Sequence, residues 1–489
     1  MPEPRRVGSC KIWQPTIMGG GYFLMQNEKS QSLRSPELLP TKDSERTLSL
    51  WDYTILWAGM TINIVAFSLG AQYFNGGDGL SPWMLVLVVF LGYGLVTVLT
   101  VLAGDIGTKY GVPFAVYSRA AFGYKGSFFA GLVRCVPCFY WFGFQTWVGA
   151  NALNMIMGIM FPSFNNVTLM LILFAAFQIV NALFGMEAMA KFDWIAVPML
   201  GIMFAAIVVT VCNKYGVSIP DIMGVKAAGN YSMAFAISGI AGGWITMALN
   251  GPDLARQIRR SDNYKNEGLI KRNKNAIVGQ LVGLMAVGII AMMVGMAAGI
   301  YTHEWDLNNV VYSLFSNNML VLVFCFIAIA FAQWSTNTAA NLMPPAYILL
   351  NIFPKMKFWM TTIISGVIGL LMMPWKQQGG DFLVVIQSNF STLLGPIIGI
   401  MLADYFLVRK CTINVDDLYN VGGQYHYTSG FNMSSVVTMI LSFDLSLLAG
   451  DYSFFAGLAI SVVIYVVLMK NFTLKKYDQK LGQDIPFQE

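Results

Sequence analysis

The amino-acid sequence predicts an all-α polytopic membrane protein with 12 transmembrane helices, and three observations support this fold class. Hydrophobic residues make up 56% of the 489-residue chain and charged residues 11%, against about 25% charged residues in soluble proteins. A helix needs about 20 apolar residues to span a bilayer, and apolar stretches of this length recur along the chain. Basic residues concentrate in alternate connections between these stretches. This composition excludes a soluble enzyme, a nucleic-acid-binding protein and a disordered chain.

Apolar segments occupy most of the chain between residues 53 and 470. Residues 1–50 are interpreted as a cytoplasmic tail without the apolar core of a signal peptide, and 471–489 as a second cytoplasmic tail. Residues 1–24 differ from the more ordinary polar tail that begins at Met25, and they are set aside as a candidate extension. The predicted spans are 53–73, 82–104, 128–161, 166–186, 192–213, 231–251, 275–301, 318–343, 358–374, 381–408, 431–449 and 453–470.

The distribution of Lys and Arg predicts the orientation in the plasma membrane. Seven basic residues lie in the N-terminal tail, and seven more lie between Arg256 and Lys274, after span 6. The connections of the opposite side hold only Lys214, Lys226 and Lys376. Because basic residues favour the cytoplasmic side, both termini are predicted to be cytoplasmic. The basic runs are thus interpreted as topology signals, with the lipid bilayer and no nucleic acid as partner.

Spans 1 and 6 carry residues that weaken helices. Span 1 contains Gly59 and Asn63, and span 6 contains the pair Gly242 and Gly243. Paired glycines let a backbone or a ligand approach closely. The two spans are five apart, as expected if residues 51–213 and 231–408 form inverted repeats whose first helices unwind at mid-membrane, followed by two helices at 431–470. Such breaks indicate a transporter's binding site, and tight helix packing around small residues is the alternative.

Polar and aromatic residues gather in the same region of the spans. Trp141 and Gln145 share a face of span 3, and Trp244 follows the glycine pair. Span 8 ends in a polar run that reaches Asn341, and unsatisfied polar groups at this depth are costly. We predict that two indoles stack a flat ring, while amides from Asn63, Gln145 and Asn341 bond its edge. The ligand should be neutral, planar and amide-like. Membrane-interface anchoring and interhelical bonding are the alternatives.

Adjacent hydroxyls at Ser335 and Thr336 indicate a cation site. Carbonyl oxygens freed near Gly59 and Ile62 would complete a set of oxygen ligands for a small cation. A bound cation also gives the membrane potential a charge to act on, worth about 2.3 kcal/mol per 100 mV. The sequence therefore predicts cation-coupled symport, with hydroxyls bonded to their own helix as the alternative. Asp444 in span 11 is a carboxylate to test as a proton carrier.

Several segments resemble the nucleobase–cation symporter-1 family, over residues from about 36 to 470. The resemblance implies a leucine-transporter-type fold with a five-plus-five inverted repeat and two extra C-terminal helices. The matching segments are GlyThrLysTyrGlyValProPhe at 107–114, TrpPheGlyPheGlnThrTrp at 141–147, AsnGlyProAspLeuAlaArg at 250–256, TrpSerThrAsnThrAlaAlaAsn at 334–341, MetMetProTrp at 372–375 and LeuGlyProIleIleGlyIleMetLeuAlaAspTyrPhe at 394–406.

The resemblance also implies site residues and departures from the family pattern. The substrate-binding residues would be Asn63, Trp141, Gln145, Gly243, Trp244 and Asn341, and the cation ligands Gly59, Ile62, Ala332, Ser335 and Thr336. Both hydroxyls are present, which favours Na⁺, whereas family members lacking one look proton-coupled. In the sodium-coupled hydantoin transporter of the family, Gln stands in place of Asn63 and Pro in place of Thr338. Asn at this position looks more like the allantoin and nucleobase branches.

The sequence as a whole predicts a secondary active importer that works by alternating access. Allantoin, hydantoin and uracil are the candidate substrates, with Na⁺ or H⁺ as coupling ion, no other cofactor, and a monomer as the functional unit. A purine or cytosine permease with proton coupling is the alternative. A channel should instead show a continuous polar stripe, and a membrane-embedded enzyme should show clustered His, Glu or Asp at membrane depth.

Overall fold

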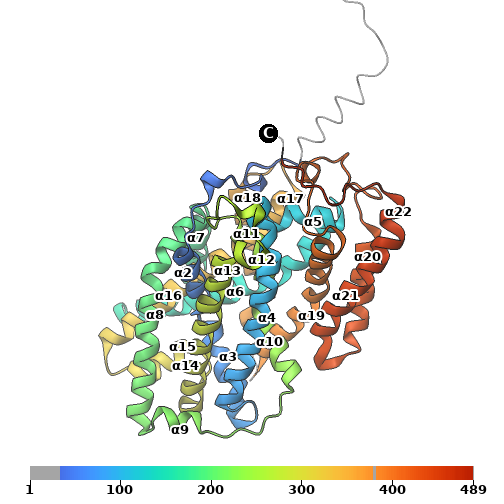
Figure 1. The fold of residues 1–489 in the computed structure, drawn as a ribbon. Helices are drawn as coiled ribbons and strands as arrows, with labels where there is room; N and C mark the ends of the chain where they lie inside the picture. The colour runs from blue at the N-terminus through green and yellow to red at the C-terminus, as the bar shows by residue number, and fades with distance from the viewer. Residues whose placement is uncertain (1–32, 378–380, 488–489) are drawn as a thin grey trace, which may run out of the picture.

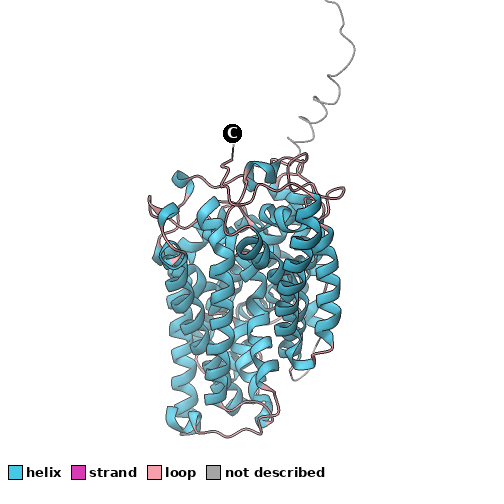
Figure 2. Cartoon of the chain, turned by 45° about the vertical axis from the view of Figure 1, so that its right-hand side comes forward, coloured by secondary structure: helices cyan, strands magenta, loops and turns pink. Residues whose placement is uncertain are grey.

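The structure, a computed structural model, describes residues 33–377 and 381–487, which form a bundle of helices (Figures 1 and 2). Among the described residues, eight helices are long and apolar enough to cross a membrane, one bent pair makes a ninth crossing, and three shorter apolar helices accompany them. These segments coincide with the 12 predicted spans, so the all-α polytopic fold class is confirmed. The candidate extension at 1–24 lies outside the described residues.

The first five spans run from α2 to α8. The short helix α5 (Phe114–Phe122) lies between spans 2 and 3, and α9 (Ile219–Met223) follows the fifth span. The spans are α2 (Leu50–Thr61) with α3 (Ile64–Phe74), α4 (Pro82–Tyr110), α6 (Gly126–Met160), α7 (Val167–Ala182) and α8 (Gly185–Tyr215).

The remaining spans include π-helical turns at several points. The short helices α12 (Leu269–Arg272) and α15 (Leu307–Phe315) lie in connections. The spans are α10 (Met233–Leu249) with α11 (Gly251–Ala255), α13 (Lys274–Gly279) with η5 (Gln280–Ala286) and α14 (Val287–Thr302), α16 (Met319–Asn337) with η6 (Thr338–Leu342) and α17 (Met343–Ile352), α18 (Phe358–Leu371), α19 (Phe382–Leu402) with η8 (Ala403–Val408), α20 (Met433–Leu447), and α21 (Ser453–Leu468) with η11 (Met469–Thr473) and α22 (Leu474–Lys476).

Span 1 is broken between α2 and α3, as predicted. The two halves meet at a bend of 49°. Ile62 leaves the helical region, with φ −78° and ψ 63°, and Asn63 is extended, with φ −122° and ψ 171°. The Asn63 side chain then starts α3 by accepting a hydrogen bond from the Ala66 N–H at 2.9 Å. Asn is among the residues that most favour this capping position, so Asn63 itself explains where the helix restarts.

The helix packing has the symmetry expected of two repeats. Span 1 packs against α14 of span 7 and α8 of span 5, while span 6 packs against α4 of span 2 and α19 of span 10. Span 3 likewise packs against span 4 through α6 and α7, and span 8 against span 9 through α17 and α18. These contacts of the first five spans are therefore repeated five spans later, as expected for two structural repeats.

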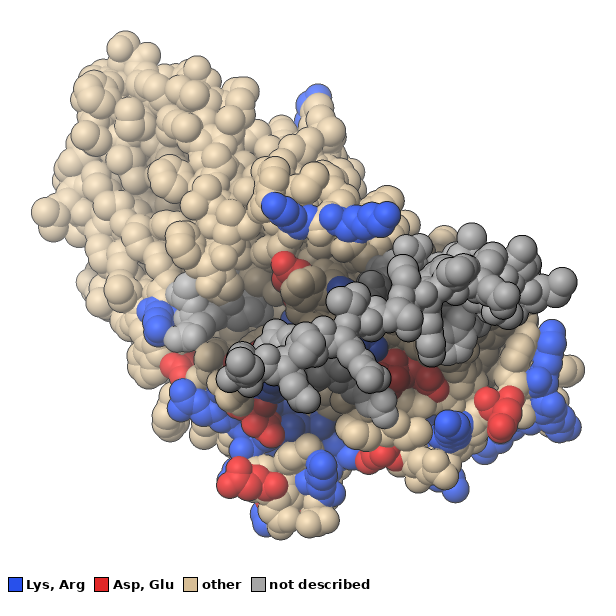
Figure 3. All heavy atoms as spheres, turned by 90° about the horizontal axis from the view of Figure 1, so that it is seen from above, with Lys and Arg blue, Asp and Glu red and all other residues tan. Residues whose placement is uncertain are grey.

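Both described ends of the chain lie at one end of the bundle (Figure 1). From residue 33 onward, the predicted N-terminal tail packs onto this end, where Leu38 is buried and the Arg46 side chain is almost fully buried. The Arg46 guanidinium donates to carbonyl oxygens of the α4 end and of the segment after α10, including Gly107 at 3.1 Å and Ile258 at 3.2 Å. Seen from this end, basic and acidic side chains are interspersed on one part of the surface, while a large region carries neither (Figure 3).

Candidate substrate and cation sites

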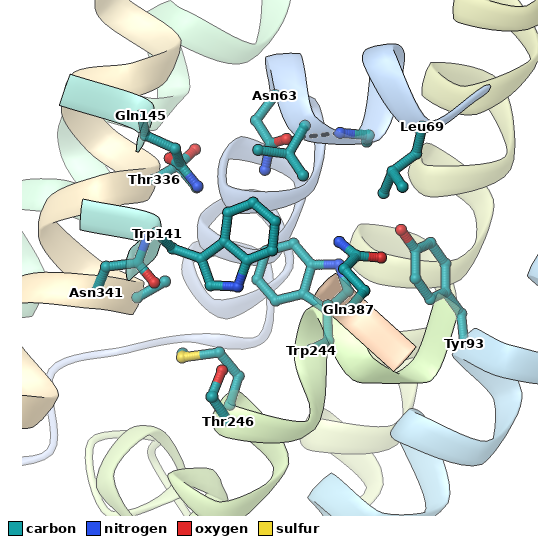
Figure 4. Close-up of a pocket in the computed structure, with 15 residues that line it drawn as sticks. Asn63, Leu69, Tyr93, Trp141, Gln145, Trp244, Thr246, Thr336, Asn341 and Gln387 are labelled. Carbon is teal, nitrogen blue, oxygen red and sulfur yellow. Dashed lines mark hydrogen bonds between the residues drawn. The ribbon is translucent and has the colours of Figure 1, made fainter. Parts of the chain in front are cut away.

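A small cavity lined almost entirely by buried side chains lies beside the break in span 1 (Figure 4). Its lining comes from spans 1, 2, 3, 6, 8 and 10, and none of the described lining residues is Asp, Glu, Lys, Arg or His. A neutral lining suits a ligand without a net charge. All the residues predicted for substrate binding meet here, namely Asn63, Trp141, Gln145, Gly243, Trp244 and Asn341.

The two predicted indoles face this cavity from opposite halves of the chain. Trp141 on α6 is 3% exposed and Trp244 on α10 is 8% exposed, so neither is a membrane-interface anchor. Phe144 and Phe390 hold the Trp141 ring through edge contacts with centroid distances of 6.0 and 6.1 Å. The Trp244 ring leans against Trp57 of span 1 at 5.6 Å. Both rings are therefore fixed before any ligand arrives.

The amide side chains of the cavity differ in how many of their polar atoms already have a hydrogen-bond partner. The Asn63 amide nitrogen donates to the Met60 carbonyl at 2.5 Å, and its oxygen caps α3. The Asn341 amide nitrogen donates to the Asn337 amide oxygen at 2.9 Å. By contrast, Gln145 Oε1 is buried and has no hydrogen-bond partner among the described residues. Asn63 thus acts first as a structural residue of the break, whereas Gln145 offers a free acceptor.

Gln387 is a cavity residue that the sequence reasoning missed. It lies in α19, lines the cavity and is 2% exposed, with Oε1 lacking a partner in the described part of the chain. The Trp141 indole Nε1–H is buried and unpartnered there as well. The available signal was the polar sequence that begins at Gln387 and continues with Ser388 and Asn389 inside span 10, because an amide at this depth needs a partner.

The glycine pair of span 6 does not interrupt its helix, so this part of the prediction is wrong. α10 continues through Gly242 and Gly243 and ends at Leu249. A Cβ on Gly242 would lie 1.9 Å from the Gln387 carbonyl oxygen, and one on Gly243 would lie 2.7 Å from Gln387 Nε2. The pair lets span 10 approach span 6 closely at the cavity, so the packing alternative holds here and the helix keeps its hydrogen bonds.

The predicted cation ligands are only partly joined by direct contacts. The break turns the Asn63 N–H toward the Thr61 carbonyl at 2.8 Å, so the Gly59 carbonyl loses its usual helical donor. Thr336 Oγ1 donates to this Gly59 oxygen at 3.0 Å. Ser335 Oγ donates to Asp193, a buried carboxylate of α8 that the sequence reasoning did not consider.

The remaining predicted cation ligands lie in the same part of the fold. Ile62 lies at the break of span 1, and Ala332 lies one helical turn before Thr336. Both residues are buried, and the contacts just described do not involve their carbonyls. Asp444, which the sequence indicated for a test, is instead exposed on α20 and does not line the cavity.

The polar run of span 8 is satisfied mostly by neighbouring helices. Asn337 Nδ2 donates to the Phe142 carbonyl at 3.0 Å, to Thr146 Oγ1 at 3.0 Å and to Gln178 Oε1 at 2.6 Å. Gln178 Nε2 in turn donates to Thr146 Oγ1 at 3.0 Å. This network ties spans 3, 4 and 8 together and holds Asn341 at the cavity wall.

A symmetric helical bundle with a bent first span and a buried cavity at the bend defines a secondary transporter of the leucine-transporter type. The chain belongs to the family of permeases for cytosine/purines, uracil, thiamine and allantoin, whose model matches residues 40–474. It is therefore a membrane transporter and not an enzyme.

Curated relatives match the chain over most of its length. It is 29% identical to the hydantoin permease of Microbacterium maritypicum, over 91% of this chain and 90% of that protein. It is 28% identical to the allantoin permease of Bacillus subtilis, over 91% and 94%. The purine-uracil permease of Arabidopsis thaliana is 26% identical, over 85% and 71%.

Solved structures agree with the fold. A nucleobase–cation-symport-1 family transporter in a closed conformation with bromovinylhydantoin bound superposes with a TM-score of 0.86, at 28% identity and over 91% of this chain and 97% of that one. A Na⁺-coupled sialic acid symporter shares the fold with a TM-score of 0.61 at 14% identity, over 93% and 96%.

Proposed function

We propose that the chain is a cation-coupled symporter that imports a planar, uncharged nitrogen heterocycle by alternating access. The observation that carries this proposal is the uncharged cavity, in which a Trp141 N–H donor and the Gln145 and Gln387 acceptors are buried without partners among the described residues. Buried polar groups are costly unless a partner completes them. A ring that alternates N–H and C=O groups supplies both kinds of partner, while the indoles supply stacking faces. Allantoin, hydantoin and uracil have this character.

Na⁺ is the coupling ion that the oxygen set favours, with ligands proposed at Gly59, Ile62, Ala332, Ser335 and Thr336. The proposed Na⁺ site contacts the break of span 1. The cavity residue Asn63 caps α3, the helix that begins after this break. One shared bend thereby links cation occupancy to the shape of the substrate cavity. Proton coupling, with a purine or cytosine as substrate, is the alternative.

The proposed organisation follows the repeat. Residues 51–213 and 231–408 form the inverted repeats, 431–470 the additional helices, and 1–50 and 471–489 the terminal segments. We place the protein in the plasma membrane as a monomer with both termini in the cytoplasm. The shared location of the two described chain ends and an even number of spans support termini on one side, and the distribution of Lys and Arg supports the cytoplasmic side.

Paired ring compounds test the substrate class. Cells expressing the chain should accumulate at least one of labelled allantoin, hydantoin or uracil above vector-only cells. A neutral ring should compete far better than its carboxylate derivative, as with uracil against orotate or hydantoin against hydantoin acetic acid. The reason is that the cavity holds no described basic side chain to compensate a carboxylate. Equal competition by the charged partner would contradict the proposal, and preferred competition by cytosine or adenine would support the purine or cytosine alternative.

Removing the Thr336 hydroxyl tests the cation site. We expect Thr336→Ala to raise the Na⁺ concentration needed for half-maximal uptake about tenfold or more, because a bond to a charged group is worth about 1.5–3 kcal/mol. Thr338→Ala is the matched control, since the Thr338 hydroxyl donates to the Trp334 carbonyl of its own helix at 2.7 Å. Uptake by the parent that ignores Na⁺ but follows a pH gradient would assign H⁺ instead.

A further inference from the structure

A buried carboxylate lies beside the proposed cation ligands. Asp193 on α8 is 0% exposed. Its Oδ1 accepts a hydrogen bond from Ser335, and its Oδ2 is buried with no hydrogen-bond partner among the described residues. An ionised carboxylate without a compensating positive charge is costly to bury. The free oxygen therefore points to a cationic ligand that is bound during the transport cycle.

Asp193 packs directly on the backbone of span 1. A Cβ on Gly59 would lie 2.5 Å from Asp193 Cγ, 2.6 Å from Oδ1 and 2.8 Å from Oδ2. The missing side chain at Gly59 thus makes room for the carboxylate just before the break. The Gly59 carbonyl is also the oxygen that accepts the Thr336 hydroxyl. Oxygen atoms from α2, α8 and α16 consequently converge on one small region of the membrane interior.

We propose that the ionised carboxylate of Asp193 is a ligand and counter-charge of the coupling cation. This inference rests on the cation coupling proposed above. Carboxylate, hydroxyl and carbonyl oxygens are the ligands that hard cations prefer. The Ser335 hydroxyl can donate a hydrogen bond to Asp193 while its lone pairs face the cation. One bound monovalent cation leaves the site without net charge, whereas a divalent cation leaves an excess positive charge in a low-dielectric region. The site therefore selects a monovalent ion.

Cation binding to the purified full-length protein tests this inference directly. Binding of radiolabelled sodium and the rise in melting temperature with Na⁺ are measured at constant ionic strength, with choline as the replacing ion. The parent should show a saturable response. Asp193→Asn keeps the side-chain volume, removes the charge, and should raise the half-saturating Na⁺ concentration by at least about thirtyfold. Asp444→Asn removes an exposed carboxylate from α20 and should stay within about twofold of the parent.

The outcomes separate this inference from the proposed function. A folded Asp193→Asn protein with parental Na⁺ affinity overturns the role of Asp193, while the response of the parent leaves Na⁺ coupling standing. A parent that neither binds Na⁺ nor gains stability from it refutes Na⁺ coupling, and the inference with it, before any variant is compared.

A second measurement covers the case in which Asp193→Asn does not fold. Na⁺-induced infrared difference spectra of the parent should contain a shifted carboxylate stretching band, since the cation binds a carboxylate. Asp193→Ser, which keeps one oxygen without the charge, should lack this band. A parent spectrum without any carboxylate change overturns the inference.

Discussion

Trp141→Ala is expected to lower the affinity for the transported ring about thirtyfold, because stacking of a base on an aromatic side chain is worth about 1–3 kcal/mol and 2 kcal/mol corresponds to that factor. The indole is held by Phe144 and Phe390, so its stacking face is in position before binding. Its removal also deletes the unpartnered Nε1–H donor of the cavity. Uptake at low substrate concentration should fall by at least the same factor while membrane expression stays normal.

Gln145→Ala extends the same prediction to the ring edge. Gln145 lines the cavity, and its Oε1 is unpartnered among the described residues. A polar group at the edge of the bound ring that loses this buried partner would cost about 1–3 kcal/mol. We expect uptake to fall on the order of tenfold to hundredfold. Trp83→Ala is the control, since Trp83 is 66% exposed on α4 and does not line the cavity. Near-normal transport by both cavity variants would refute the proposed substrate site.

Much of this cavity could be predicted because mid-membrane polarity has few explanations. Asn63, Gln145 and Asn341 lie in apolar spans, where each amide must find a partner or a ligand. The structure brings all three to one cavity with both tryptophans. The sequence could not reveal which hydrogen bonds each amide makes within the protein and which it leaves for a ligand. Asn63 turns out to cap α3, a role that depends on the exact residue at which the helix restarts.

The sequence did not predict a role for Asp193, because the predicted fifth span begins later than the helix does. The hydropathy of the fifth span places its start at residue 192, which would leave Asp193 at the membrane surface. α8 in fact begins at Gly185, so Asp193 lies two turns inside the helix and is fully buried. Apolar patterning locates spans but not their helical extensions, and the error here concealed the carboxylate nearest the cation ligands.

The glycine pair illustrates a different limit. Gly242 and Gly243 weaken a helix in isolation, yet the same small size permits a close contact with Gln387. Sequence alone cannot decide between the two effects, because the decision depends on which helix lies opposite. Here span 10 supplies packing that exceeds the cost of the glycines, and α10 stays intact.

Asn337→Leu is expected to be the most destabilising of the changes considered, because a single buried amide holds the network between spans 3, 4 and 8. The substitution removes the donor of the bonds to Phe142, Thr146 and Gln178, as well as the acceptor for Asn341. Hydrogen bonds between membrane helices average about 0.6 kcal/mol each, and the groups left unpaired add to that loss. We expect a loss of about 2–4 kcal/mol and, for a chain of this length, a melting temperature lower by about 2–4 °C.

Asn471→Leu provides the comparison for that measurement. Asn471 is exposed, and its amide bonds only the Val467 carbonyl of its own helix at 2.9 Å among the described residues. Its replacement should change stability by no more than about 0.5 kcal/mol. Since the Asn337 network lies behind Asn341 and not in the cavity lining itself, Asn337→Leu should also weaken substrate binding through a displaced Asn341. Equal melting temperatures for the two variants would mean that the network contributes no net stability, and that packing alone joins spans 3, 4 and 8.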